Sequence, residues 1–139
     1  MLRAARGKGV GVRAAAGDQK RAARVRRLRW VDLSFNRLTG IKASFTDFKN
    51  ISVLYLHANK ISKFGEIKPL GELAKLRSLT LHGNPIEDKK HYRTYVIYTI
   101  SSINQLDFSP ITRQDRENAQ TWSTVFRKKL SGEIREDEY

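Results

Sequence analysis

One eleven-residue pattern occurs three times in this chain, and it constrains the fold more than any other feature. Each copy has the form LxxLxLxxNxL, where x is any residue and Ile or Val can replace Leu. The copies span residues 28–38, 51–61 and 76–86. Their asparagines, Asn36, Asn59 and Asn84, lie 23 and then 25 residues apart. A pattern that returns at such a period predicts a solenoid, in which each copy forms one turn and stacks on the next.

The spacing within each copy is typical of leucine-rich repeats. Apolar residues such as Val31 and Leu33 alternate with outward residues, as they do in a short strand with one buried face. Stacked copies would therefore form a parallel sheet on a concave side. The asparagine follows where the chain leaves the strand, and its side chain can bond the backbone groups freed there. We interpret Asn36, Asn59 and Asn84 as structural residues.

Apolar residues between the predicted strands recur at near-helical intervals, and we expect them to close the convex side with helical or irregular turns. These residues are Ile41, Phe45, Phe48, Phe64, Ile67, Leu70 and Leu73. After Pro85, residues 87–100 carry apolar side chains at helical spacing, with acids near the start. A final half-repeat, Ile103, Leu106 and Phe108, then lacks the asparagine.

The chain is expected to close with a capping helix over residues 113–130. Thr112 can cap its start, and an apolar stripe can pack onto the last repeat. The stripe consists of Ala119, Trp122, Phe126 and Leu130. Residues 131–139 are interpreted as a frayed tail. The predicted class is thus α/β: a short leucine-rich-repeat solenoid over residues 28–112, with a concave parallel sheet, convex turns and a C-terminal cap helix.

Basic residues are concentrated near the amino end. Residues 1–29 hold ten Lys or Arg and one acid, and so contribute +9 of the net charge of +13. Residues 1–27 contain no aromatic residue, and burial of so little apolar surface cannot offset the entropy of ordering. We predict a disordered basic leader over residues 1–27. A mitochondrial presequence and a phosphate-binding arm for nucleic acid are the alternatives.

Several function classes lack the residues that they need. The sequence has no cysteine, which excludes disulfides and a thiolate nucleophile and suits a reducing compartment. The longest apolar runs fall far short of the roughly 20 residues of a membrane-spanning helix. The spacing supports no Ser/His/Asp set, paired carboxylates or Gly-rich nucleotide turn. We therefore predict no enzyme activity, no cofactor and no membrane insertion.

Stacking in register would place the outward strand positions in three columns on the concave sheet. The columns are Trp30, Val53, Ser78 and Gln105; Asp32, Tyr55, Thr80 and Asp107; and Ser34, His57, His82 and Ser109. Such a surface can accept a helix or an extended segment, with Trp30 and Tyr55 as aromatic anchors. The predicted protein-binding residues are Trp30, Asp32, Ser34, Val53, Tyr55, His57, Thr80, His82 and Asp107.

Two of these residues, His57 and His82, would be neighbours on strands roughly 4.8 Å apart. A shared metal ion would need a third ligand, and that column offers no further histidine or well-placed carboxylate, so no metal site is predicted. The pair could instead make partner binding depend on pH.

Longer segments extend beyond the repeat pattern itself, over residues 30–39, 52–57, 76–85, 92–96, 106–109 and 112–116. Together they resemble a family of small cytoplasmic leucine-rich-repeat proteins of vertebrates that end in a C-terminal cap. That family has a further repeat-like strand before Val31, where this chain has its basic leader. We therefore expect the edge of the first strand to be uncovered unless another molecule covers it.

The resemblance implies no established activity. Small capped proteins of this general kind occur in ciliary axonemes, dynein assembly, spliceosomes and phosphatase regulation, where the repeat serves as a protein-binding surface. We predict a cytoplasmic, non-catalytic adaptor or scaffold that binds another protein on its concave face, with a ciliary or axonemal assembly as a candidate setting. The alternative is a nucleic-acid-associated protein that uses its basic N-terminal arm.

Overall fold

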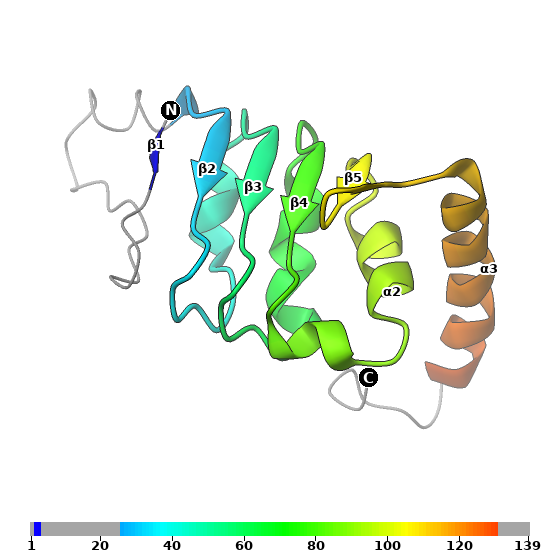
Figure 1. Ribbon diagram of the computed structural model, residues 1–139. Coiled ribbons are helices and arrows are strands. Elements are labelled where there is room, and N and C mark those ends of the chain that lie inside the picture. Colours follow the sequence, from blue (N-terminus) through cyan, green and yellow to red (C-terminus); the bar gives the residue numbers. More distant parts are fainter. Residues whose placement is uncertain (1, 4–25, 131–139) are drawn as a thin grey trace.

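A computed structural model of the chain describes residues 2–3 and 26–130 (Figure 1). Its strands lie side by side in a single sheet, and strands that are consecutive in the chain are neighbours in the sheet. All pairs are parallel except the last, in which β5 and β6 are antiparallel. The strands are β1 (Leu2–Arg3), β2 (Trp30–Asp32), β3 (Val53–Tyr55), β4 (Ser78–Thr80), β5 (Gln105–Leu106) and β6 (Ser109–Pro110). The predicted solenoid with a concave parallel sheet is confirmed.

Short 3-10 turns close the convex side, behind the sheet in Figure 1. They are η1 (Ala43–Asp47), η2 (Phe64–Glu72) and η3 (Pro85–Asp88). In η2 the buried residues are Phe64, Ile67 and Leu70. Their three-residue spacing equals one turn of a 3-10 helix, so all three point into the core between this turn and the sheet. The expected helical or irregular convex turns are therefore present.

The repeat asparagines connect successive turns of the solenoid. The Asn59 amide donates to the carbonyls of Leu56, in its own turn, and Leu33, in the previous turn, at 2.9 and 3.0 Å. Its oxygen accepts the backbone N–H of Leu38 at 3.1 Å. Asn84 repeats the arrangement one turn further on, and both side chains are almost fully buried. The structural interpretation of these asparagines is confirmed.

The helix expected over residues 87–100 is shorter than predicted. The 3-10 turn η3 comes first, and the α-helix α2 (Tyr92–Thr99) begins only at Tyr92. Between them His91 adopts a left-handed conformation with φ of 65°. This break changes the direction of the chain and lets α2 turn its buried residues, Tyr92, Val96 and Ile97, toward the last repeat.

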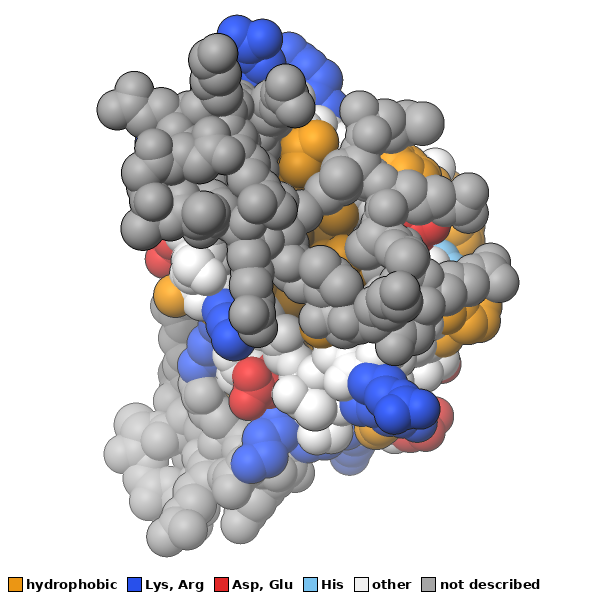
Figure 2. Space-filling view, turned by 90° about the vertical axis from the view of Figure 1, so that its left-hand side faces the viewer, with side chains coloured by type: hydrophobic (Ala, Val, Ile, Leu, Met, Phe, Trp, Pro, Cys, Tyr) orange, Lys and Arg blue, Asp and Glu red, His pale blue; other side chains and the backbone are white. Residues whose placement is uncertain are grey.

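The edge of β2 is covered by this chain, contrary to the expectation of an uncovered strand. Leu2 pairs with Val31 and Arg3 with Asp32 in parallel. Leu2 and Arg3, which belong to the predicted leader of residues 1–27, therefore have a defined strand pairing. Residues 4–25 and the predicted tail, 131–139, lie outside the described residues. Figure 2 looks at this end of the solenoid, where hydrophobic side chains are visible beside the grey atoms.

The C-terminal cap is the helix α3 (Arg113–Leu130), which packs beside α2 (Figure 1). Over residues 113–126, where the side chains are described, Ala119 and Ser123 are buried. Trp122 lies against the rings of Tyr95 and Phe126, with ring centroids 6.2 and 4.4 Å away. The predicted packing of the apolar stripe is confirmed for Ala119, Trp122 and Phe126, and the side chain of Leu130 lies outside the described residues. Within the described ranges, no helix is both long and apolar enough to cross a membrane.

Thr112 and Asp115 form a reciprocal cap at the start of α3. The Thr112 hydroxyl accepts the backbone N–H of Asp115 at 3.0 Å, and the Asp115 carboxylate accepts the backbone N–H of Thr112 at 2.9 Å. Arg93 of α2 donates to the same carboxylate at 3.2 Å. The hydrogen bond from the Thr112 backbone, followed by Arg93, lowers the pKa of Asp115.

Replacing Thr112 with alanine is expected to lower the free energy of unfolding by about 1 kcal/mol, because a helix N–H loses its capping oxygen. Urea unfolding of Thr112→Ala measures this loss, and Thr121→Ala, at an exposed position within α3, is the matched control. An equal stability of Thr112→Ala and Thr121→Ala at neutral pH would contradict the capping role.

The pKa of Asp115 is lower in the folded chain than in the unfolded chain. The stabilising effect of this carboxylate is therefore present above the ordinary carboxyl pKa of about 4 and is lost as the pH falls further.

Candidate functional site

The sheet brings the outward strand positions together as predicted. Trp30 lies opposite Val53, and Asp32 lies opposite Tyr55. On the next pair of strands Val53 lies opposite Ser78, and Tyr55 opposite Thr80. The first column continues through Gln105, which pairs with Ser78. The predicted register of the first two columns is therefore confirmed across β2, β3 and β4.

Aromatic side chains form a continuous cluster on this surface, and we call five of them the aromatic patch: Trp30, Tyr55, His57, His82 and Phe108. The exposed ring of Phe35 extends the cluster, with its centroid 5.5 Å from that of His57. The Trp30 and Tyr55 rings meet edge to face with centroids 5.6 Å apart. His57 and His82 are stacked at 4.6 Å with nearly parallel rings, as expected for neighbours on adjacent turns. Phe108 lies 5.5 Å from Tyr55 and 5.8 Å from His82, which joins the two pairs.

Three predicted contact residues are buried and support the surface from beneath. Asp32 accepts hydrogen bonds from the backbone N–H and the hydroxyl of Ser34, and both residues are less than one-tenth exposed. Thr80 is fully buried, and its hydroxyl oxygen accepts the Leu56 N–H at 3.1 Å. The same oxygen lies 2.7 Å from Nδ1 of His57. Burial of these side chains argues against direct contact with a partner. Sequence alternation places a residue on a face but does not show how its neighbours cover it.

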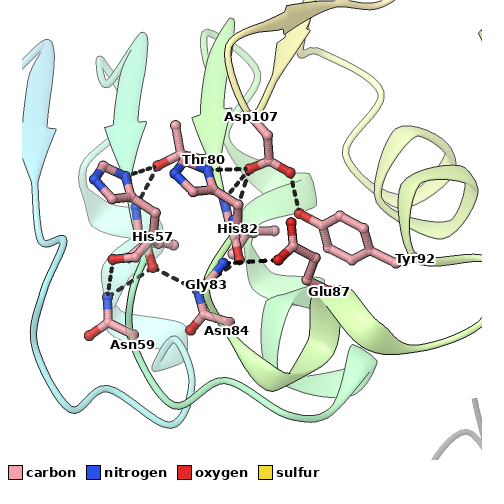
Figure 3. Close-up of polar contacts among 11 residues, drawn as sticks. His57, Asn59, Thr80, His82, Gly83, Asn84, Glu87, Tyr92 and Asp107 are labelled. Atoms are coloured by element: carbon pink, nitrogen blue, oxygen red, sulfur yellow. Dashed lines mark hydrogen bonds and ion pairs between the residues drawn. The ribbon is translucent and has the colours of Figure 1, made fainter.

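Asp107 joins the concave face to the C-terminal cap (Figure 3). One carboxylate oxygen accepts the backbone N–H groups of Leu81 and His82 at 2.6 and 2.9 Å and lies 3.2 Å from His82 Nδ1. The other accepts the Tyr92 hydroxyl at 2.7 Å. Burial, and then the charge of Asp107, raise the pKa of Tyr92, so this hydroxyl remains a donor. Asp107, a predicted contact residue, therefore positions His82 with a carboxylate that is only partly exposed.

Phe108 is an exposed aromatic residue that the sequence analysis did not place on the concave face. Its position in the half-repeat corresponds to that of the core residue Leu81, but its side chain is 57 % exposed on the concave side. Asp107 and Phe108 both adopt left-handed conformations, with φ of 53° and 63°. The chain therefore turns back one residue after Leu106, and Ser109 pairs with Leu106 in β6 instead of extending the third column. The missing asparagine after this half-repeat was the signal that the strand would not continue.

The polar groups of the site are few. Among residues 2–3 and 26–130, no three His, Cys, Asp or Glu side chains are placed so that they could hold a metal ion. His57 and His82 are the two candidate ligands on this face, and their Nδ1 atoms face Thr80 and Asp107 (Figure 3). What the arrangement offers is a half-exposed aromatic surface held by buried polar residues.

Stacked parallel strands, buried asparagines between successive turns and a helical cap define a capped leucine-rich-repeat solenoid. The leucine-rich repeat family model matches residues 20–137, and the chain belongs to this family.

Several curated relatives align with this chain, at identities from 37 % to 55 % over the aligned residues. Leucine-rich repeat-containing protein 51 of Homo sapiens is 55 % identical over 98 residues, which are 70 % of this chain and 51 % of that protein. The Rattus norvegicus protein of the same name is 49 % identical over 110 residues, 79 % of this chain and 57 % of its own. The chain thus spans about half the length of these relatives. A probable U2 small nuclear ribonucleoprotein A' of Caenorhabditis elegans is 37 % identical over 95 residues, 68 % of this chain and 38 % of that protein.

Solved structures share the fold. The Drosophila melanogaster SNF/U2A' complex contains a chain that superposes with a TM-score of 0.71 at 24 % identity, covering 93 % of this chain and 85 % of that one. The leucine-rich-repeat domain of Mex67 from Chaetomium thermophilum has a TM-score of 0.56 at 22 % identity, covering 65 % of this chain and 63 % of that one. At these identities the similarity shows the architecture alone.

Proposed function

We propose that this chain is a non-catalytic adaptor that binds a helix or an extended segment of another protein on its concave face. Leucine-rich repeats generally mediate protein binding, and this chain belongs to that family. The observation that carries the proposal is the aromatic patch, in which neighbouring strands contribute rings in contact with one another. Binding is assigned to the repeats of residues 28–112, and closure of the solenoid to the helix of residues 113–130.

Aromatic anchors of this kind dominate binding energy because they bury a large area with few rotatable bonds. Trp30 and Tyr55 are only half-buried in the chain itself, so a partner can bury the remainder. Partly buried polar contacts beneath the patch, Thr80 with His57 and Asp107 with His82, hold the rings in place before binding. Preorganisation of this kind lowers the entropy that association costs.

The Tyr55→Ala variant is expected to weaken partner binding by about thirtyfold, the effect of removing an anchor worth roughly 2 kcal/mol. The measurement is affinity capture from ciliated cells, followed by titration of the captured protein against the wild-type and variant chains. Ciliated cells are chosen because the proposal places the adaptor in the cytoplasm, in a ciliary or axonemal assembly.

Val125→Ala is the matched control, because Val125 is 54 % exposed on α3, outside the aromatic patch. Circular dichroism of both variants checks that the fold is intact. Captured proteins that bind wild type and Tyr55→Ala equally would show that the concave face is not the binding surface.

The alternative, a nucleic-acid-associated protein, is tested on the same material. Binding through the basic arm should vanish after nuclease treatment and should fall by orders of magnitude between low and physiological salt, because Lys and Arg release counterions from phosphates. Replacing Arg21, Arg24, Arg26, Arg27 and Arg29 with glutamine should then abolish capture. Capture that survives both treatments and still depends on Tyr55 supports the concave-face adaptor.

A further inference from the structure

We propose that the aromatic patch binds an uncharged, proline-rich segment in the polyproline II conformation, and that Phe108 is one of its contact residues. This inference rests on the proposed function, because it names the class of segment that the same face would hold. Three features carry it: the conformation of Phe108, the charge of the face and the hydrogen-bonding character of its rings.

Phe108 is exposed by a costly backbone conformation. A left-handed conformation costs about 1–2 kcal/mol for a residue with a side chain, and Asp107 and Phe108 adopt it consecutively. The Asp107 carboxylate holds the turn through Leu81, His82 and Tyr92. The result places a phenyl ring that is 57 % exposed against Tyr55 and His82. Strain and an exposed ring at one position are typical of a binding site.

The concave face carries little charge, although the chain as a whole has a net charge of +13. Among the described residues, no lysine or arginine occurs at the outward positions from β2 to β4, which are Trp30, Asp32, Ser34, Val53, Tyr55, His57, Ser78, Thr80 and His82. Arg3 of β1 lies opposite Asp32 and is a cation at the edge of the face. The carboxylates of Asp32 and Asp107 are already bound to donors of this chain. Between β2 and β4 an acidic segment would therefore meet no cation of the described residues, and a basic segment would compete with existing hydrogen bonds. Charge complementarity favours an uncharged segment.

The described edges of the sheet do not favour a partner that adds as a strand. The edge strands β1 and β6 have two residues each, and Pro110 of β6 has no N–H to donate. The partner segment must then lie across the face and use side-chain contacts. A helix satisfies its own backbone groups and would leave the hydrogen-bond donors of the aromatic rings unused. Val53 is the one aliphatic residue among the outward positions named above.

A polyproline II segment fits this surface better. Its backbone has no internal hydrogen bonds, so its carbonyls need donors, and its proline rings pack flat against aromatic rings. The Tyr55 hydroxyl and the Trp30 indole N–H are donors on rings that meet edge to face. Three strand intervals from β2 to β5 span about 14 Å, which about five residues of such a segment cover at roughly 3.1 Å each.

The test is a titration of the full, ¹⁵N-labelled chain with an acetylated and amidated peptide of about ten prolines, a length that exceeds the face. The chain has two tryptophans, Trp30 in the patch and Trp122 in α3, and their indole N–H signals serve as site and internal control. We expect the Trp30 signal to shift on peptide addition and the Trp122 signal to stay. We expect Phe108→Ser to weaken binding at least tenfold and the equally exposed Val125→Ser to leave it unchanged.

A second variant, Tyr55→Phe, keeps the ring and removes the hydroxyl, and it should weaken binding severalfold without unfolding the chain. A helix-forming peptide of leucine and glutamine is the competing probe. The proposal is overturned if the proline peptide shifts nothing at about 1 mM, if the helical peptide binds in its place, or if Phe108→Ser binds as wild type does. If Tyr55-dependent capture of a cellular partner persists in these cases, the class of segment is wrong but the concave-face adaptor stands.

Discussion

The Phe64→Ala variant is expected to lose about 3–5 kcal/mol of folding free energy, a large share of what a domain of this size has. Phe64 begins η2, is 1 % exposed, and stacks on Tyr95 with ring centroids 4.2 Å apart. Truncation removes this contact and leaves a cavity between the convex turn and α2, which the surrounding turns can fill only in part. Chemical unfolding monitored by circular dichroism measures the loss.

Phe108→Ala provides the matched control, because it removes the same atoms from a ring that is 57 % exposed. Its stability should change by less than about 1 kcal/mol, since little buried area is lost. If Phe64→Ala does not fold, Phe64→Leu keeps most of the volume and should still unfold at lower denaturant than wild type. Equal losses for Phe64→Ala and Phe108→Ala would contradict the assignment of one ring to the core and the other to the surface.

The Asn59→Ala variant is expected to destabilise the chain by about 2–4 kcal/mol, because one side chain serves several buried backbone groups. The Leu38 N–H loses its acceptor, and the carbonyls of Leu33 and Leu56 each lose a donor. The lost hydrogen bonds connect two turns of the solenoid, so the substitution should also lower the cooperativity of unfolding. Urea unfolding and amide hydrogen exchange at Leu38 measure the two effects.

Asn104→Ala, at an exposed position before β5, is the control for the same substitution. It should change stability by no more than about 0.5 kcal/mol. If Asn59→Ala behaves like Asn104→Ala, water can replace the hydrogen bonds of Asn59, and these bonds between the turns contribute little to the free energy of unfolding.

Much of the candidate site was predictable because the repeat is local and periodic. Once one strand is placed, a constant period aligns the next, and so the opposition of Trp30 to Val53 and of Tyr55 to Thr80 followed from spacing alone. The same holds for the stacked pair His57 and His82. The buried role of the asparagines was equally accessible, because a turn that leaves a strand must satisfy its backbone groups.

The places where prediction failed are those where the period ends or where neighbours decide exposure. Alternation assigned Thr80 to the binding surface, but the side chains of adjacent turns bury it completely. One continuous helix was expected where a left-handed residue, His91, separates η3 from α2.

The sequence by itself determined the repeat architecture, the register of the strands and the capping helix after Thr112, because these depend on the spacing of apolar residues and on local hydrogen bonding. Only the tertiary structure decided that Leu2 and Arg3 pair beside β2 and that Phe108 turns onto the concave face. Both outcomes depend on contacts between residues far apart in the chain. Asp107 bonds Leu81, His82 and Tyr92, and these three bonds stabilise a left-handed turn that the local sequence alone disfavours.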